Sequence, residues 1–235
     1  MKTIARLAIL ACDNARARAY IDRLARCGLR PAYALIVDVP AISLVPVTAN
    51  ATSLFDNVTP LAKQCEKNGI PFARMAANTI NHPDVVAETL RMPAEYIVYA
   101  GPGGAILAPD FFAGEKQFIH IHPGRLPEFR GSTPYYYELI MRGGMTATAM
   151  LMSPKIDEGS VIAAREFPAP QRPEMIDTEL DPWMRAEILG EVAETLSATG
   201  HLPNASPQSG DAQTFFVIHT VLKTIAALKS VSRAT

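Results

Sequence analysis

The sequence predicts an α/β fold with a Rossmann-like, mostly parallel sheet and helices on both of its faces. Two observations lead to this prediction. Short apolar runs alternate with segments of helical spacing through the first half of the chain, and several of those segments are bounded by capping residues. The 235 residues suit one domain, or one domain with a small appendage, and 49% of them are apolar, which is ordinary for a globular core.

The expected strands are short apolar runs. They lie at residues 7–11, 32–37, 71–76, 95–100, 117–121, 147–153 and 161–167. The helices are expected between these runs, in the parts of the chain where apolar residues recur at helical spacing. They lie at residues 13–28, 59–67, 84–90, 134–143 and 178–199. Residues 38–54 are expected to form a loop, and residues 215–228 a helix or a strand followed by a helix.

Capping residues predict where these helices begin and end. Asp13 or Asn14 can cap the first helix, which closes at Gly28, and its arginines are expected to form a solvated face. Thr59 can cap the second helix, with Pro60 at its first position.

Composition excludes several classes of protein. The net charge of −1 predicts no nucleic-acid partner, and no run approaches 18 apolar residues, so we expect no membrane span. The first apolar run is too short for a signal peptide. Three scattered cysteines form no C-x-x-C pair, and the expected setting is the cytoplasm.

Two histidines mark the end of the expected strand at residues 117–121. His120 and His122 lie two residues apart, so their side chains share one face while Ile119 and Ile121 point to the other. The prolines and glycine that follow indicate a rigid, irregular loop, and such loops carry sites. Two structural histidines bonded to backbone groups are the alternative interpretation.

The turn Lys155–Gly159 supplies a carboxylate between two expected strands. Asp157 alone is typical of a turn former. Beside the two histidines, however, it becomes a base or an orienting group. Two histidines and a carboxylate also suit zinc or iron, so a metal-dependent enzyme remains an alternative.

These residues lie in longer motifs. The run HPGRLPEFRGSTP, followed further along by IDEGSVI, resembles the signature of folate-dependent formyltransferases. EYIVYAGPGGAILAPDFF is similar to that family's fourth strand and following loop, and GIPFARM to the segment at its third strand. The family includes enzymes that formylate glycinamide ribonucleotide, methionyl-tRNA and sugar amines. The resemblance implies a catalytic domain over residues 1–165, with residues 166–235 as an extension packed on it.

The resemblance implies a catalytic trio with one departure. The family's His and Asp fall on His122 and Asp157, and its Asn falls on His120. The family's amide donates a hydrogen bond to the oxygen of the reacting formyl group. An imidazole can do so only when the nitrogen that faces the pocket carries a proton.

The implied formyl donor is 10-formyltetrahydrofolate. The loop after residue 100 is expected to bind its pterin ring through backbone groups that glycines leave accessible. The expected donor-binding residues are Gly101, Gly103, Gly104, Ile106, Leu107 and Ile156. The spacing is not that of a dinucleotide-binding turn, and an ordinary glycine turn is the alternative.

The acceptor is expected to be a small-molecule amine. The turn after the first strand has no glycine to cradle a phosphate, although Arg16 or Arg18 could hold another anion, and the tail is short and weakly basic. Tyr135, Asp177 and Trp183 are candidate acceptor-binding residues, and a capped helix with an apolar Trp is the alternative. Hydrolysis of 10-formyltetrahydrofolate, a catalytically inactive binding module and a homodimer all stay open.

Overall fold

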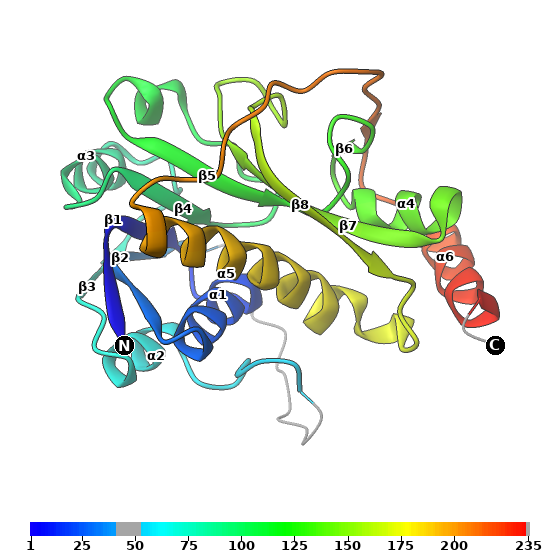
Figure 1. Ribbon diagram of the computed structural model, residues 1–235, viewed down its shortest axis with the longest axis horizontal. Coiled ribbons are helices and arrows are strands. Elements are labelled where there is room, and N and C mark those ends of the chain that lie inside the picture. Colours follow the sequence, from blue (N-terminus) through cyan, green and yellow to red (C-terminus); the bar gives the residue numbers. More distant parts are fainter. Residues whose placement is uncertain (41–52, 234–235) are drawn as a thin grey trace.

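A seven-stranded sheet forms the centre of the fold, and five neighbouring strands in it run parallel (Figure 1). The computed structural model describes residues 1–40 and 53–233. The strand order is β3-β2-β1-β4-β5-β7-β8, with β7 antiparallel to both β5 and β8. The strands are Lys2–Ala11 (β1), Leu29–Asp38 (β2), Phe72–Ala76 (β3), Tyr96–Ala100 (β4), Gln117–His122 (β5), Gly144–Leu151 (β7) and Val161–Pro168 (β8). The predicted mostly parallel α/β sheet is confirmed.

The helices divide between two cores, one on each face of this sheet. They are Ala15–Arg26 (α1), Leu61–Lys67 (α2), Pro83–Arg91 (α3), Pro134–Arg142 (α4) and Asp181–Thr199 (α5), with short turns at Pro109–Phe112 (η1) and Pro173–Met175 (η2). Alternate side chains of β1 pack in the two cores. Leu7 and Ile9 pack with α1, α2 and α5, whereas Ala8 and Leu10 pack with α3 and η1.

Capping chemistry sets the ends of α1 as the sequence predicts. The Asn14 side chain accepts a hydrogen bond from the Ala17 N–H at 2.9 Å, and Gly28 reverses the chain at φ +68°. The predicted Thr59 cap of the second helix is wrong. Pro60 occupies the cap position, and no side chain caps α2. Of the predicted loop at residues 38–54, residues 41–52 lie outside the described residues.

The predicted solvated face of α1 is wrong for part of its arginines. Arg26 is mainly exposed, but Arg16 donates a 2.7 Å hydrogen bond to the Gly101 carbonyl at the end of β4. Arg23 forms a 2.9 Å ion pair with Glu187 of α5. Helix α5 packs along α1, so this side of α1 faces protein instead of water.

Several elements begin earlier than predicted, including β1, β2, β7 and the helix predicted at residues 178–199. Helix α4 ends at Gly143, in the left-handed conformation, and β7 starts at the next residue instead of at residue 147. The helix predicted at residues 178–199 begins as a π-helical turn at Ile176–Leu180 (η3) and continues as α5.

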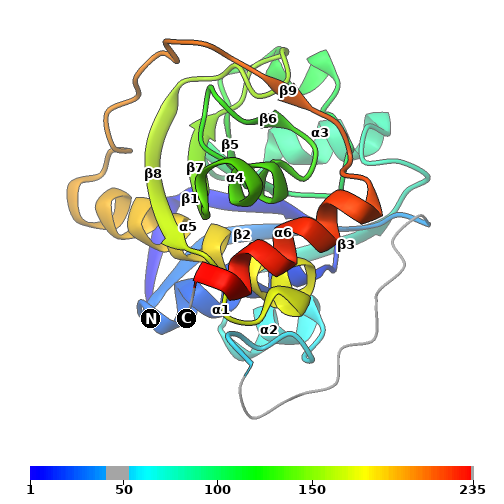
Figure 2. The ribbon, with the colours of Figure 1, turned by 90° about the vertical axis from the view of Figure 1, so that its right-hand side faces the viewer.

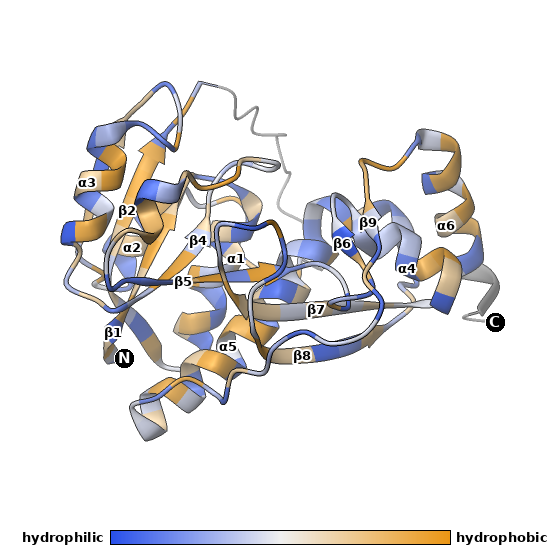
Figure 3. Ribbon diagram, turned by 90° about the horizontal axis from the view of Figure 1, so that it is seen from above, coloured by the Kyte–Doolittle hydropathy of each residue, from blue (hydrophilic) through white to orange (hydrophobic). Residues whose placement is uncertain are grey.

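The C-terminal segment crosses back over the loops at one edge of the sheet (Figure 1, orange). Ser206 pairs with Val161, and Thr214–Phe215 (β9) lies parallel to Arg130–Gly131 (β6) (Figure 2). The chain ends in Thr220–Arg233 (α6), which packs on α4 and carries apolar residues at the edge of the molecule (Figure 3). Of the two forms predicted for residues 215–228, the strand followed by a helix is observed.

The boundary expected between residues 165 and 166 falls inside β8, which belongs to the central sheet. A division there stays a prediction. In the described part of the chain, every helix is too short or too polar to cross a membrane.

Candidate active site

His120 and His122 lie at the carboxyl end of β5, on the same face of the sheet. Ile119 and Ile121 are fully buried in the core that contains α1 and α5. The two imidazoles therefore face away from that core, as the strand period requires, with ring centroids 6.3 Å apart. His122 is 1% exposed, whereas His120 is partly exposed. Of the two, His120 is therefore the more accessible to a ligand.

Hydrogen bonds fix the orientation of His122. Its Nε2 atom lies 2.6 Å from the Phe129 carbonyl oxygen, and its Nδ1 atom lies 3.4 Å from Oδ1 of Asp157. A carbonyl can only accept a hydrogen bond, so Nε2 carries a proton and donates it to Phe129. Nδ1 then faces the carboxylate, either as a charged donor or as a neutral nitrogen that shares a proton with it.

The loop around Asp157 is held by backbone and side-chain donors. Asp157 has φ +53°, and its Oδ2 accepts a 2.9 Å hydrogen bond from the Gly131 N–H. Gln208 Nε2 donates to the carbonyls of Asp157 and Gly159, both at 2.8 Å. Two separate parts of the chain, at Gly131 and Gln208, thus hold this turn and its carboxylate beside His122.

The charges of the site favour a neutral His120 and an ionised Asp157. Burial and the nearby charges of Arg16 and Arg185 hold the pKa of His120 well below its usual value, and His122 adds to this effect. Burial raises the pKa of Asp157, but the hydrogen bond and charge of His122 and the Gly131 N–H outweigh burial, so this pKa lies below its usual range. A charged His120 is thereby disfavoured, and its donor capacity depends on the tautomer.

Because the pKa of His120 is lowered in the folded chain, we expect the free energy of unfolding to depend on pH. In the unfolded chain His120 gains a proton as pH falls through about 6.5, whereas the folded chain does not, so the free energy of unfolding decreases. The contribution of one such group is at most about 1.4 kcal/mol per pH unit. Urea unfolding in EDTA at pH 7.5 and pH 5.5 should show a smaller loss for His120→Asn than for the wild type. An equal loss in both proteins would contradict the lowered pKa.

The glycine-rich loop after β4 has one crowded position and an open side. A Cβ at Gly101 would lie 2.4 Å from the Tyr99 ring, whereas a Cβ at Gly103 or Gly104 would meet nothing within 4 Å. Gly104 also has φ +75°, which favours glycine. The loop therefore leaves open space beside its backbone, as a site for a flat ring requires.

The apolar candidates for donor binding differ in exposure. Ile106 and Ile156 are 53% and 55% exposed, which is unusual for large apolar side chains in loops beside a polar site. Leu107 instead packs in the core with α3 and η1, so only its backbone is accessible to a ligand.

The three acceptor candidates do not lie together, because Tyr135 contacts Asp177 whereas Trp183 lines a separate cavity. The hydroxyl of Tyr135 donates to Asp177 at 3.1 Å, and Asp177 also accepts from Tyr136 at 2.9 Å and pairs with Lys223. These contacts join α4, η3 and α6. Trp183 lines an apolar cavity of about 760 Å³ on the α5 side of the sheet, where its ring packs edge-on against Phe167.

Sequence reasoning missed several groups around the histidines. Nothing in the sequence marked Gln208 or the Phe129 carbonyl, because both depend on contacts between distant segments. Arg185, whose segment was considered for the acceptor site together with Asp177 and Trp183, donates to the Ile121 carbonyl at 3.2 Å. Tyr99, with its ring centroid 6.4 Å from that of His120, was marked only as part of a strand.

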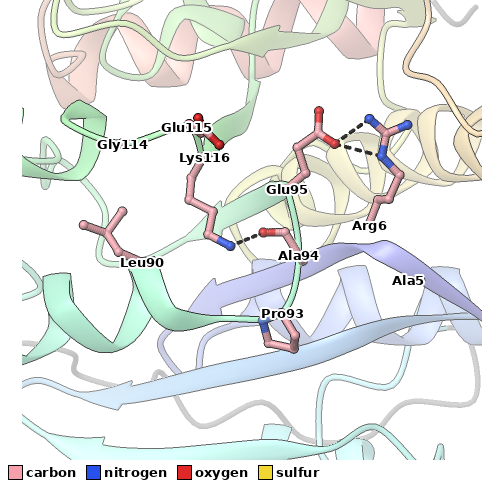
Figure 4. A pocket seen from close by; sticks show the side chains of 9 residues that line it. All are labelled: Ala5, Arg6, Leu90, Pro93, Ala94, Glu95, Gly114, Glu115 and Lys116. Atoms are coloured by element: carbon pink, nitrogen blue, oxygen red, sulfur yellow. Dashed lines mark hydrogen bonds and ion pairs between the residues drawn. The ribbon is translucent and has the colours of Figure 1, made fainter.

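A second cavity, of about 680 Å³, lies at the opposite edge of the sheet (Figure 4). It is formed near the amino ends of β4 and β5, where Arg6 pairs with Glu95 and Lys116 bonds to the Ala94 carbonyl. In parallel α/β sheets ligands bind at the carboxyl ends of the strands, so the histidine edge is the candidate active site.

Comparisons with known proteins concern the family and the fold of the chain. The formyl transferase family profile matches residues 34–177. A methionyl-tRNA formyltransferase of Rhodopirellula baltica is 29% identical over 111 residues, which are 46% of this chain and 32% of that protein. The chain spans about a third of the length of the curated relatives it matches.

Two solved structures show the same fold over nearly the whole chain. A sugar N-formyltransferase from Shewanella sp. aligns with a TM-score of 0.58 at 16% identity, covering 95% of this chain and 87% of that one. HypX from Aquifex aeolicus, in complex with tetrahydrofolic acid, aligns with a TM-score of 0.55 at 13% identity, covering 96% of this chain and 33% of that one.

Proposed function

The chain belongs to the formyl transferase family, and from this premise we propose that it transfers a formyl group from 10-formyltetrahydrofolate to a small-molecule amine in the cytoplasm. One observation carries the proposal. Ligand atoms of His120, His122 and Asp157 lie within 4.8 Å of one another at the carboxyl end of β5. Here a neutral imidazole can donate a hydrogen bond while a neighbouring buried carboxylate accepts a proton.

Each member of the trio has a distinct role in this proposal. When bound, the folate supplies the formyl carbon that the amine attacks. His120 donates to the formyl oxygen, where negative charge develops, and so replaces the amide that the family carries. Asp157 accepts the proton that the amine releases, directly or through water, and this proton would pass to N10 of the folate as the bond between N10 and the formyl carbon breaks. His122 orients this carboxylate, because its own Nε2–H is engaged by Phe129.

Two features of the chain fit a folate. The open side of Gly103 and Gly104 leaves room for a flat ring to approach the backbone. Exposed Ile106 and Ile156 offer apolar surfaces that a pterin would cover. Backbone N–H and C=O groups of the loop would then hydrogen-bond the ring edge.

Folate binding is expected to stabilise the fold. A ligand that binds only the folded chain adds about 2.7 kcal/mol at a concentration one hundred times its Kd. A thermal melt with 5-formyltetrahydrofolate should therefore show a higher Tm, and Ile156→Asp should reduce the shift. Met141→Asp, at another exposed apolar residue, is the matched control and should keep it. If millimolar 5-formyltetrahydrofolate did not raise the Tm of correctly folded wild-type protein, the proposed reaction would be refuted.

A small amine is the acceptor that the fold comparison favours. In structural alignments the sugar N-formyltransferase is covered over 87% of its own length with a TM-score of 0.58, and a methionyl-tRNA formyltransferase from Clostridium thermocellum over 73% with a TM-score of 0.53. Assays with amino sugars, glycinamide ribonucleotide and methionyl-tRNA would separate these classes. Efficient formylation of methionyl-tRNA would replace the small-amine proposal.

A divalent metal is the second candidate for this site. Histidine ligands of metals commonly donate their other N–H to a backbone carbonyl, as His122 does to Phe129. Two imidazoles and one carboxylate would suit zinc or iron. Elemental analysis of purified protein, with activity measured before and after EDTA, tests it. Full activity in metal-free protein would exclude the metal-dependent reaction and leave folate-dependent formyl transfer as the remaining candidate.

A further inference from the structure

Two buried polar atoms without partners lie on one face of α1. Arg16 Nε and the Tyr20 hydroxyl have no hydrogen-bond partner in the described structure. Residues four apart share a helix face, and Tyr20 is 0% exposed. A buried hydroxyl without a partner is costly, so such atoms mark a place where a ligand supplies the missing group.

Arg16 also lacks a counterion. Its Nη2 donates to the Gly101 carbonyl at 2.7 Å, but no acid forms an ion pair with it among residues 1–40 and 53–233. Burial and the charge of Arg185 lower the pKa of Arg16. Its neighbour Arg18, by contrast, is paired with Asp13 at 2.7 Å.

Arg185 brings a second guanidinium to the same end of the sheet. It donates to the Ile121 carbonyl of β5, next to the β4 end that Arg16 reaches. Asp181 accepts from Arg185 at 2.7 Å and neutralises one charge. Two guanidinium groups and one carboxylate leave one positive charge, which acts on both Tyr20 and His120.

We propose that Arg16, Arg185 and the Tyr20 hydroxyl bind an anionic group, a carboxylate or a phosphate, carried by the acceptor amine. The inference rests on the proposed formyl transfer and names the substrate class: an amine with an acidic group near it. The anion supplies the missing countercharge, accepts from Arg16 Nε and from the Tyr20 hydroxyl, and holds the amine at the strand ends beside His120.

Anion binding can be tested before the acceptor is known. Thermal melts at constant ionic strength should show that inorganic phosphate or acetate stabilises the wild type more than chloride does. The preferred anion distinguishes a phosphate from a carboxylate. Arg16→Gln should weaken binding roughly tenfold or more, as expected for a charged hydrogen bond. Arg26→Gln removes an exposed arginine of the same helix and should bind like the wild type.

Tyr20→Phe provides a variant that should fold in any case. Its lost hydroxyl has no partner, so in chloride the variant should be at least as stable as the wild type, while its affinity for phosphate or acetate falls roughly threefold to tenfold. Equal melting in all three anions, or unchanged anion affinity in both Arg16→Gln and Tyr20→Phe, would overturn the inference.

Folate titrations separate this inference from the proposed reaction. Tyr20→Phe, whose lost hydroxyl bonds to no residue of the donor loop, should bind 5-formyltetrahydrofolate like the wild type. Loss of folate binding in this variant would assign Tyr20 to the donor site and overturn the inference, while the proposed formyl transfer would stand. Anion binding in a wild type that does not bind folate would leave the anion site but remove the proposed reaction.

Discussion

Replacing Asp157 with asparagine is expected to lower formyl transfer by roughly two to four orders of magnitude, the range for positioned acid–base groups. The amide cannot take the proton that the amine releases. The fold should survive, because asparagine tolerates the left-handed backbone of this position, φ +53°, and its oxygen can still accept from the Gly131 N–H. Single-turnover rates with saturating donor, together with urea unfolding, measure the two effects.

Glu158→Gln is the matched control for this experiment. It removes the same charge from the next residue, whose side chain is largely exposed and pairs with Lys155 and Arg130. Its turnover should stay within a few-fold of the wild type. If Asp157→Asn turned over as fast as Glu158→Gln, Asp157 would be only a turn former.

Two substitutions of His120 are expected to differ in their formyl-transfer turnover. His120→Ala removes the donor to the formyl oxygen and should lower turnover by roughly two to three orders of magnitude, as loss of one oxyanion donor does elsewhere. His120→Asn restores a neutral amide donor and should keep measurable transfer. Because the folded histidine is already neutral near pH 7, the asparagine variant should also lose any ionisation that His120 contributes at acidic pH.

The turnover of these two variants decides between roles for His120. If it is a base or a metal ligand, both variants should be nearly inactive. If His120→Ala retained wild-type turnover, His120 would have no part in stabilising the formyl oxygen. His82→Ala and His82→Asn, at an exposed histidine that caps α3, control for the general effect of each change.

The sequence was sufficient to predict the features that depend on local periodicity. The alternation of His120 and His122 with two isoleucines required a common face, because β-strand side chains alternate whatever lies around them. Asn14 and Gly28 bounded α1 through interactions within one turn. The predicted proximity of Asp157 to His122 came from a family resemblance, and the 3.4 Å distance agrees with it.

Features that depend on long-range packing were not predictable in this way. Arg16 has the helical phase of a surface residue, and only the packing of α5 along α1 turns it towards the strand ends. Trp183 was expected in the acceptor site, but its position after the π-helical turn places it in the apolar cavity on the α5 side. Gln208 lies in a segment with no periodic pattern.

The return of residues 200–216 across the sheet edge has a consequence for how the protein is made. Gly131, whose N–H holds Asp157, lies in β6, and β6 pairs only with β9. A Cβ at Gly131 would lie 2.2 Å from the Phe215 carbonyl oxygen, so the two backbones touch. During synthesis on the ribosome, the parallel sheet can assemble before this segment emerges, whereas Asp157, the proposed proton acceptor, gains its final supports only after residue 215. A late step of folding is then the one that completes the proposed site.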